Sequence, residues 1–137
     1  MKKSFTLIEI LVVTTIIVLL TAGAIVSYST FLKRSRDAKR KTDLEQLRAA
    51  LEMYRSTEDA YPVGAAWGTT LNVLTTPVTY IQSLPADPKN PTYSYYYNGS
   101  SSDYTLGTYL EGGGTICVAG QCGGYCNYCV GPYGQTN

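Results

Sequence analysis

The sequence predicts an α+β protein, in which a long N-terminal helix packs on a small antiparallel β-sheet head that ends in a cysteine-rich loop. Three observations predict this fold class. Residues 10–32 carry no charge, an amphipathic pattern follows as far as residue 57, and residues 58–137 combine tyrosine- and threonine-rich segments with four cysteines. We therefore expect a helix in two parts, 5–32 and 33–57, followed by the head.

The uncharged segment is long enough to cross a membrane. As a helix its 23 residues, Ile10–Leu32, would span about 35 Å, more than the hydrocarbon core of a bilayer. A secretory signal peptide has a shorter apolar run, whereas this run continues directly into charged helical sequence. Glu9 stands at the head of the segment, where a carboxylate is costly unless it has a partner. We interpret residues 5–32 as a retained membrane helix and Glu9 as an assembly residue.

The charged segment that follows is also expected to be helical. Its apolar residues recur at three- and four-residue steps: Leu44, Leu47, Leu51 and Tyr54. This spacing is typical of an amphipathic helix. One helix is therefore expected from Phe5 to about Thr57, with a length on the order of 80 Å. Gly23 is the expected point of flexibility, since no proline interrupts the helix.

The head is expected to contain a two-stranded hairpin. The helix should end before Pro62, and a short helical turn is expected at Leu71–Thr75. Leu84–Pro91 contains three prolines and is expected to form no regular element. Thr92–Tyr97 and Asp103–Leu110 are rich in tyrosine and threonine, and the residues between them are typical of a turn.

Four cysteines lie in a tail that is otherwise rich in glycine and tyrosine: Cys117, Cys122, Cys126 and Cys129. A head of this size has a thin core, and closely spaced cysteines in even number favour two disulfides outside the cytoplasm. The sequence leaves the three pairings open. A zinc site of four thiolates is the competing interpretation, because Cys126 and Cys129 have the spacing of metal ligands.

Six basic residues follow the membrane helix: Lys33, Arg34, Arg36, Lys39, Arg40 and Lys41. The simplest interpretation is a solvated helical face that pairs locally with Asp37, Asp43 and Glu45. The alternative is binding of anionic headgroups or DNA, for which cations interleaved with acids make a weak footprint.

Short motifs give little indication of chemistry. The chain has no histidine, no P-loop and no Gly-x-Ser-x-Gly, so we predict neither an enzyme nor a cofactor or metal site. Asn98-Gly99-Ser100 matches the acceptor pattern for N-glycosylation on the expected turn, which is a weak signal.

The N-terminal residues carry a resemblance to a known family. Lys2-Lys3-Ser4-Phe5-Thr6-Leu7-Ile8-Glu9, followed by an apolar helix, resembles the start of type IV pilins and pseudopilins. The resemblance implies that a prepilin peptidase removes a leader of residues 1–4, cutting between Ser4 and Phe5 and methylating the new amine of Phe5. This chain has Ser4 where the family most often has glycine. It further implies that Glu9 pairs with the Phe5 amine of a neighbouring subunit and so sets the stagger between helices.

The head resembles the same family. Leu84-Pro85-Ala86-Asp87-Pro88, then Tyr93-Ser94-Tyr95 and Tyr104-Thr105-Leu106, is similar to the major pseudopilin of type II secretion. Secretion pseudopilins often hold calcium in an acidic loop after these strands, where this chain has Glu111-Gly112-Gly113-Gly114 and then cysteines. We infer that disulfides replace the metal here.

The resemblance implies a structural subunit of a type IV pilus-like extracellular filament. Such a subunit, a pilin, is stored in the membrane, is assembled by an ATPase and a membrane platform, and supports adhesion, twitching motility or DNA uptake. The alternatives are a type II secretion pseudopilin, a DNA- or surface-binding minor pilin, and a single-pass membrane protein with a zinc-binding tail. Six cations after the membrane helix against two before it would place the tail in the cytoplasm, whereas the leader motif implies export.

Overall fold

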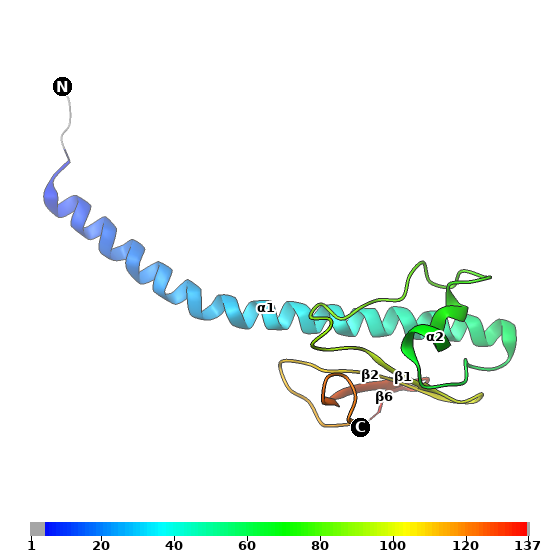
Figure 1. Ribbon diagram of the computed structural model, residues 1–137. Coiled ribbons are helices and arrows are strands. Elements are labelled where there is room, and N and C mark those ends of the chain that lie inside the picture. Colours follow the sequence, from blue (N-terminus) through cyan, green and yellow to red (C-terminus); the bar gives the residue numbers. More distant parts are fainter. Residues whose placement is uncertain (1–4, 137) are drawn as a thin grey trace. The chain divides into compact units, whose positions relative to one another are not determined.

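The computed structural model describes residues 5–136, apart from the side chains of residues 24–27. Its elements are α1 (Leu7–Glu58), α2 (Trp67–Leu71), the 3-10 turn η1 (Asn72–Leu74), β1 (Tyr96–Gly99), β2 (Tyr104–Thr108), β3 (Val118–Ala119), β4 (Tyr125–Cys126), β5 (Tyr128–Gly131) and β6 (Gly134–Thr136) (Figure 1). The chain divides into an N-terminal unit that ends at Ser35 and a head unit that begins at Arg36. The predicted fold class, a long N-terminal helix with an antiparallel β-sheet head, is confirmed.

The helix α1 has the bounds expected from its sequence to within two residues. At its start, the Thr6 side-chain oxygen lies 3.4 Å from the backbone nitrogen of Glu9 and accepts its hydrogen bond, as an N-cap does. At its end, Asp59 adopts a φ of 58° and donates its backbone N–H to Arg55. A left-handed residue of this kind commonly terminates a helix, and aspartate tolerates it better than most side chains.

The first part of α1 is apolar and exposed. Every side chain described between Leu7 and Ser35 is exposed, including large aliphatic ones such as Leu7 and Leu19. The helix is long and apolar enough to cross a membrane, with a mean hydropathy of 2.6 over its most apolar window and none of that window buried. The structure therefore agrees with a membrane-spanning segment.

The sheet of the head is larger than the sequence predicts. Four antiparallel strands lie in the order β1-β2-β5-β6, and β3 pairs with β4 in a separate two-stranded ribbon. The cysteine-rich tail was expected to be a loop, yet it supplies the last four strands. The predicted hairpin is present with shifted bounds, because β1 begins at Tyr96 and ends at Gly99. Asn98 therefore lies in a strand opposite Thr105, and the expectation that it lies on the turn is wrong.

The core of the head lies between the second part of α1 and the sheet. Figure 1 shows α1 along one side of the strands, with α2 beside its C-terminal end. Fully buried aliphatic residues of this core include Leu44, Leu47, Leu51, Leu71, Leu74 and Leu106. The predicted apolar stripe of the helix is therefore confirmed. The predicted helical turn is present as well, but it begins at Trp67 instead of Leu71.

Candidate functional site

The predicted assembly residues lie at the start of the chain. Phe5 is 75% exposed, and Glu9 lies exposed in the first turn of α1. Within residues 5–136 no cation pairs with the Glu9 carboxylate. Ser4, and with it the predicted cleavage site, lies outside the described residues. Pairing between Glu9 and Phe5 would join two chains, so it stays a prediction.

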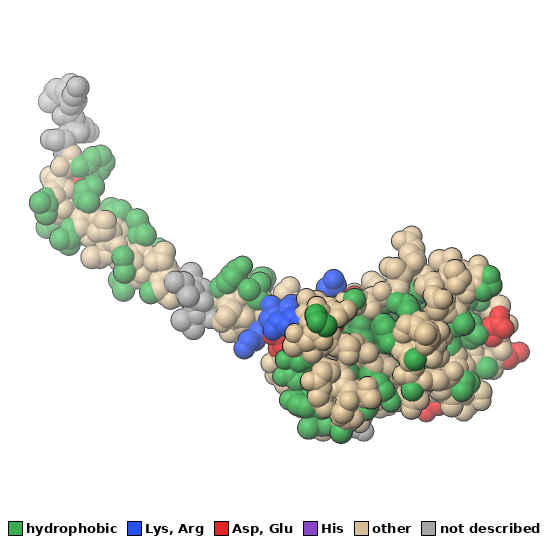
Figure 2. All heavy atoms as spheres, viewed as in Figure 1, with side chains coloured by type: hydrophobic (Ala, Val, Ile, Leu, Met, Phe, Trp, Pro, Cys, Tyr) green, Lys and Arg blue, Asp and Glu red, His purple; other side chains and the backbone are tan. Residues whose placement is uncertain are grey.

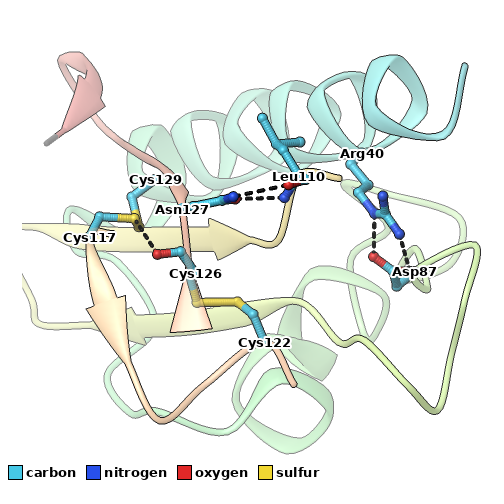
Figure 3. The surroundings of a disulfide bond; sticks show 8 residues. All are labelled: Arg40, Asp87, Leu110, Cys117, Cys122, Cys126, Asn127 and Cys129. Atoms are coloured by element: carbon cyan, nitrogen blue, oxygen red, sulfur yellow. Dashed lines mark hydrogen bonds and ion pairs between the residues drawn. A yellow bond between two sulfur atoms is a disulfide. The ribbon is translucent and has the colours of Figure 1, made fainter. Parts of the chain in front are cut away.

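A buried arginine, Arg40, forms ion pairs with three carboxylates near the start of the head unit. The side chains of Arg40 and Asp87 are both 0% exposed. Nε and Nη2 of Arg40 donate hydrogen bonds to the two carboxylate oxygens of Asp87 at 2.7 and 2.9 Å. Its Nη1 donates to Asp37 at 2.9 Å and to Glu111 at 3.1 Å. Burial disfavours the charged guanidinium, but the hydrogen bonds that it donates to Asp87 and Glu111 outweigh this effect and raise the pKa of Arg40. Figure 3 shows the two-pronged contact between Arg40 and Asp87.

Glu111 extends this contact into a cluster. Its two oxygens accept from Arg36 at 2.6 and 2.7 Å, and one of them also accepts from Lys89 at 2.9 Å. The hydrogen bonds from Arg36, reinforced by those from Lys89 and Arg40, hold the pKa of Glu111 far below its usual range. We call the whole set the ionic cluster: Arg36, Asp37, Arg40, Asp87, Lys89 and Glu111.

The ionic cluster joins three segments that are distant in sequence. It links the second part of α1 to the proline-rich segment through Asp87 and to the start of the tail through Glu111. Asp37 completes the link, since its carboxylate accepts the backbone N–H groups of Glu111 and Gly112 at 2.9 and 2.8 Å. In the loop that the family resemblance relates to calcium binding, cations of this chain therefore bind the Glu111 carboxylate and Asp37 binds the backbone.

The expectation of purely local pairing in the basic segment is wrong for two of its six residues. Arg40 does pair with Asp37 one turn away, but its main partner is Asp87, and Arg36 pairs with Glu111. A signal was present in the sequence, because Arg40 and Arg36 precede Leu44 by four and eight residues and so continue its buried stripe. Burial of Arg40, together with the pairing of Arg36 with Glu111, also reduces the cationic surface that a DNA-binding role would need.

A second buried polar pair lies further along the helix. The Tyr95 hydroxyl donates to Asp43 at 2.6 Å, and both residues are buried. Burial, followed by the bond to the carboxylate, raises the pKa of Tyr95. Asp43 is thus bonded to the residue that precedes β1, and it forms no ion pair with its basic neighbours within residues 5–136.

Two disulfides cross-link the tail, and one of them joins it to β5 of the sheet through Cys129. Cys117 bonds to Cys129 and Cys122 to Cys126, which confirms the predicted disulfides and supplies their pairing. The zinc interpretation is wrong, because all four sulfurs are joined in pairs. Between the two bonds, the Asn127 side chain exchanges hydrogen bonds with both backbone groups of Leu110, at 2.6 and 3.0 Å (Figure 3).

We expect the two disulfides to stabilise the head unequally. Replacing Cys117 and Cys129 together with alanine opens a loop of sequence separation 12 and should lower the free energy of unfolding by about 3 kcal/mol. The matched pair, Cys122→Ala with Cys126→Ala, opens a loop of separation 4 and should lower it by about 2 kcal/mol. Denaturant unfolding of the full chain in detergent, followed by the fluorescence of its single tryptophan, Trp67, measures both. The reverse order would contradict the loop-length argument.

Acid should weaken the ionic cluster through Glu111. Because its pKa in the folded head is below the ordinary 4.5, the stability that Glu111 contributes is present above that value and is lost as the pH falls below it. Glu111→Gln should therefore be less stable than wild type at neutral pH and should lose less stability between about pH 5 and pH 3. Glu45→Gln, at an exposed ion pair with Arg48, is the control and should follow the wild type. Parallel acid profiles of wild type and Glu111→Gln would contradict this expectation.

The remaining predicted site residues stay untested. Gly23 lies within α1, where an added Cβ would meet nothing within 4 Å. Asn98 is exposed and lines a small polar hollow with Ser100 and Asp103. Flexibility at the first residue and glycosylation at the second therefore stay predictions.

Comparison with known proteins gives one family. Residues 28–115, more than half of the chain, match the family described as Type II secretion system (T2SS), protein G. The matched region contains the whole ionic cluster and the β1-β2 hairpin and ends before the first cysteine of the tail. No curated protein and no solved structure gives a significant match.

Proposed function

The chain belongs to the family of type II secretion system protein G, a major pseudopilin, and on this premise we propose that it is a structural subunit of a pilus-like helical filament. The family supports assembly with other pseudopilins and with the secretion machinery. The proposed role is mechanical and not catalytic. The apolar helix would hold each subunit in the membrane until assembly withdraws it.

The observation that carries this proposal is the exposed apolar part of α1. Ile8, Leu11 and Val18 are more than half exposed, and their neighbours on every side of the helix are exposed too. A surface of this kind needs lipid or other apolar helices around it. In the membrane it faces lipid, and in a filament the same surface faces the helices of other subunits.

The N-terminal motif supports the processing that assembly requires. A prepilin peptidase would cut between Ser4 and Phe5 and methylate Phe5, so that the new amine meets Glu9 of a neighbouring subunit. Two charges that are each costly in an apolar surrounding become less costly when they pair, which favours side-by-side assembly at a fixed stagger. An assembly ATPase and a membrane platform would supply the work.

A surface pilus that supports adhesion, twitching motility or DNA uptake is the second candidate. It is favoured by the ion pairs of Glu111. This residue is bound by three cations of the chain in the loop where secretion pseudopilins often hold calcium. A DNA- or surface-binding minor pilin is a variant of this candidate, and exposed Lys39 and Lys41 would be its contacts.

The test is the intact mass and N-terminal sequence of the chain from two sources, sheared cell-surface material and isolated membranes. A chain that begins at methylated Phe5 and gains about 4 Da on reduction of two disulfides supports processing and export. Its recovery mainly in sheared fibres supports a surface pilus, whereas recovery in the membrane with secretion components supports the pseudopilin. A chain that begins at Met1 and never leaves the membrane would overturn the filament role.

A further inference from the structure

One end of the head unit carries a shallow, partly apolar groove with an acidic rim. Two adjoining hollows, of about 420 and 160 Å³, share Tyr54 and Val73 in their lining. Val63, Val73 and Val78 in these linings are 71%, 37% and 53% exposed. Glu58 lines the smaller hollow, at the C-terminal end of α1, and exposed Asp59 follows it. This end therefore offers uncovered apolar surface beside negative charge.

The opposite end of the head unit carries positive charge and an exposed apolar side chain. Lys39 and Lys41 are exposed there and lie outside the ionic cluster, whereas Lys89, the third lysine of residues 36–137, is bonded to Glu111. Ile116, 58% exposed, lies four residues after Gly112, which is bonded to Asp37. Four residues reach at most about 14 Å, so Ile116 belongs to the same end.

Charge is thus segregated along the head. Figure 2 shows Asp and Glu at the end where α1 terminates and Lys and Arg gathered where the head begins. The two ends are separated by Arg36–Glu58 of α1, or about 33 Å. The acidic end is complementary in charge to the basic end, and neither end is complementary to a second copy of itself. Contact between unlike ends of successive subunits produces an open chain instead of a closed dimer.

We propose that the acidic end of one head binds the basic end of a second copy, with Ile116 seated in the groove beside Tyr54 and Val73. The contact deepens the proposed function and rests on it, because it would add a head-to-head interaction to the packing of N-terminal helices. Opposite charges at the rim would set the orientation, and burial of Ile116 and the three valines would add apolar contact.

Photo-cross-linking of the full chain in membranes tests the contact directly. A benzoylphenylalanine at position 116 should give a two-chain adduct on irradiation, and its cross-linked peptide should map to Pro62–Val78. Val73→Asp in the same chain should reduce the adduct about tenfold, because it places a charge in the apolar groove. The same label at Gln82, which is exposed and lines neither hollow, is the control and should not give this peptide.

Charge exchange tests the rim. Glu58→Lys with Asp59→Asn should lower the adduct about tenfold by placing like charges opposite each other, and asparagine keeps the left-handed conformation of residue 59 accessible. Lys39→Glu with Lys41→Gln should lower it similarly. All four changes in one chain should restore it. Glu45→Lys, which reverses one charge in the middle of the helix, is the control and should leave the adduct unchanged.

The outcomes separate this contact from the proposed function, since filaments are scored independently in sheared material. Filaments without an adduct at Pro62–Val78, or an adduct only with another protein, would overturn the contact and leave the filament role standing. The adduct in a chain that never forms filaments would support the contact and overturn the filament role. Absence of both would overturn both.

Discussion

Replacing Arg40 with methionine should lower the free energy of unfolding of the head by about 3–5 kcal/mol. The substitution removes a guanidinium that is 0% exposed and leaves the Asp87 carboxylate buried without its main partner. It also removes one cation from Glu111 and from Asp37. Breaking one side of a buried ion pair is more destabilising than the net value of the pair, because the remaining charge stays desolvated.

The measurement is denaturant unfolding of the full chain in detergent, with Trp67 as the probe. Its ring packs 5.2 Å from Tyr95 and is the single tryptophan. Arg48→Met is the matched control, since Arg48 pairs with Glu45 at the exposed surface and its loss should change the free energy by less than about 0.5 kcal/mol. Arg40→Lys should lie between the two, because lysine retains the charge but not the two-pronged geometry. Equal effects of Arg40→Met and Arg48→Met would contradict the role of the ionic cluster.

Replacing Glu9 with alanine should lower the amount of the chain in filaments at least about tenfold, while its amount in the membrane stays the same. The carboxylate lies on a part of the helix where every described side chain is exposed, and it makes no ion pair within residues 5–136. Its loss therefore leaves the isolated subunit intact. In the filament it would leave the Phe5 amine of a neighbour without an anion in an apolar surrounding.

The ratio of chain in sheared material to chain in membranes measures this effect. Glu9→Asp should restore part of the wild-type ratio, since the charge is kept on a shorter side chain. Glu45→Ala, which removes an exposed carboxylate from the head, should leave the ratio unchanged. A wild-type ratio for Glu9→Ala would mean that the pair does not drive assembly.

Most of the fold follows from local patterns. The uncharged run and the stripe of Leu44, Leu47 and Leu51 define α1 because helical periodicity repeats within a few residues. The strands of the hairpin are recognisable from their tyrosines and threonines. The tail strands are not, since β5 and β6 consist largely of glycine, cysteine and polar residues and are stabilised by pairing with β2 and with each other.

The candidate site residues likewise divide into those that a local motif identifies and those whose contacts depend on the tertiary structure. Phe5 and Glu9 belong to a contiguous motif, so the sequence by itself predicts their role in assembly, and it also predicted the long apolar helix and the presence of disulfides. Only the tertiary structure decided which cysteines pair, that Arg40 is buried against Asp87 and that Glu111 is held by three cations. Apart from the Cys122–Cys126 bond, which spans 4 positions, these contacts join residues between 12 and 75 positions apart. Their partners are set by how the chain folds back on α1, and helical or strand periodicity carries no information about that distance.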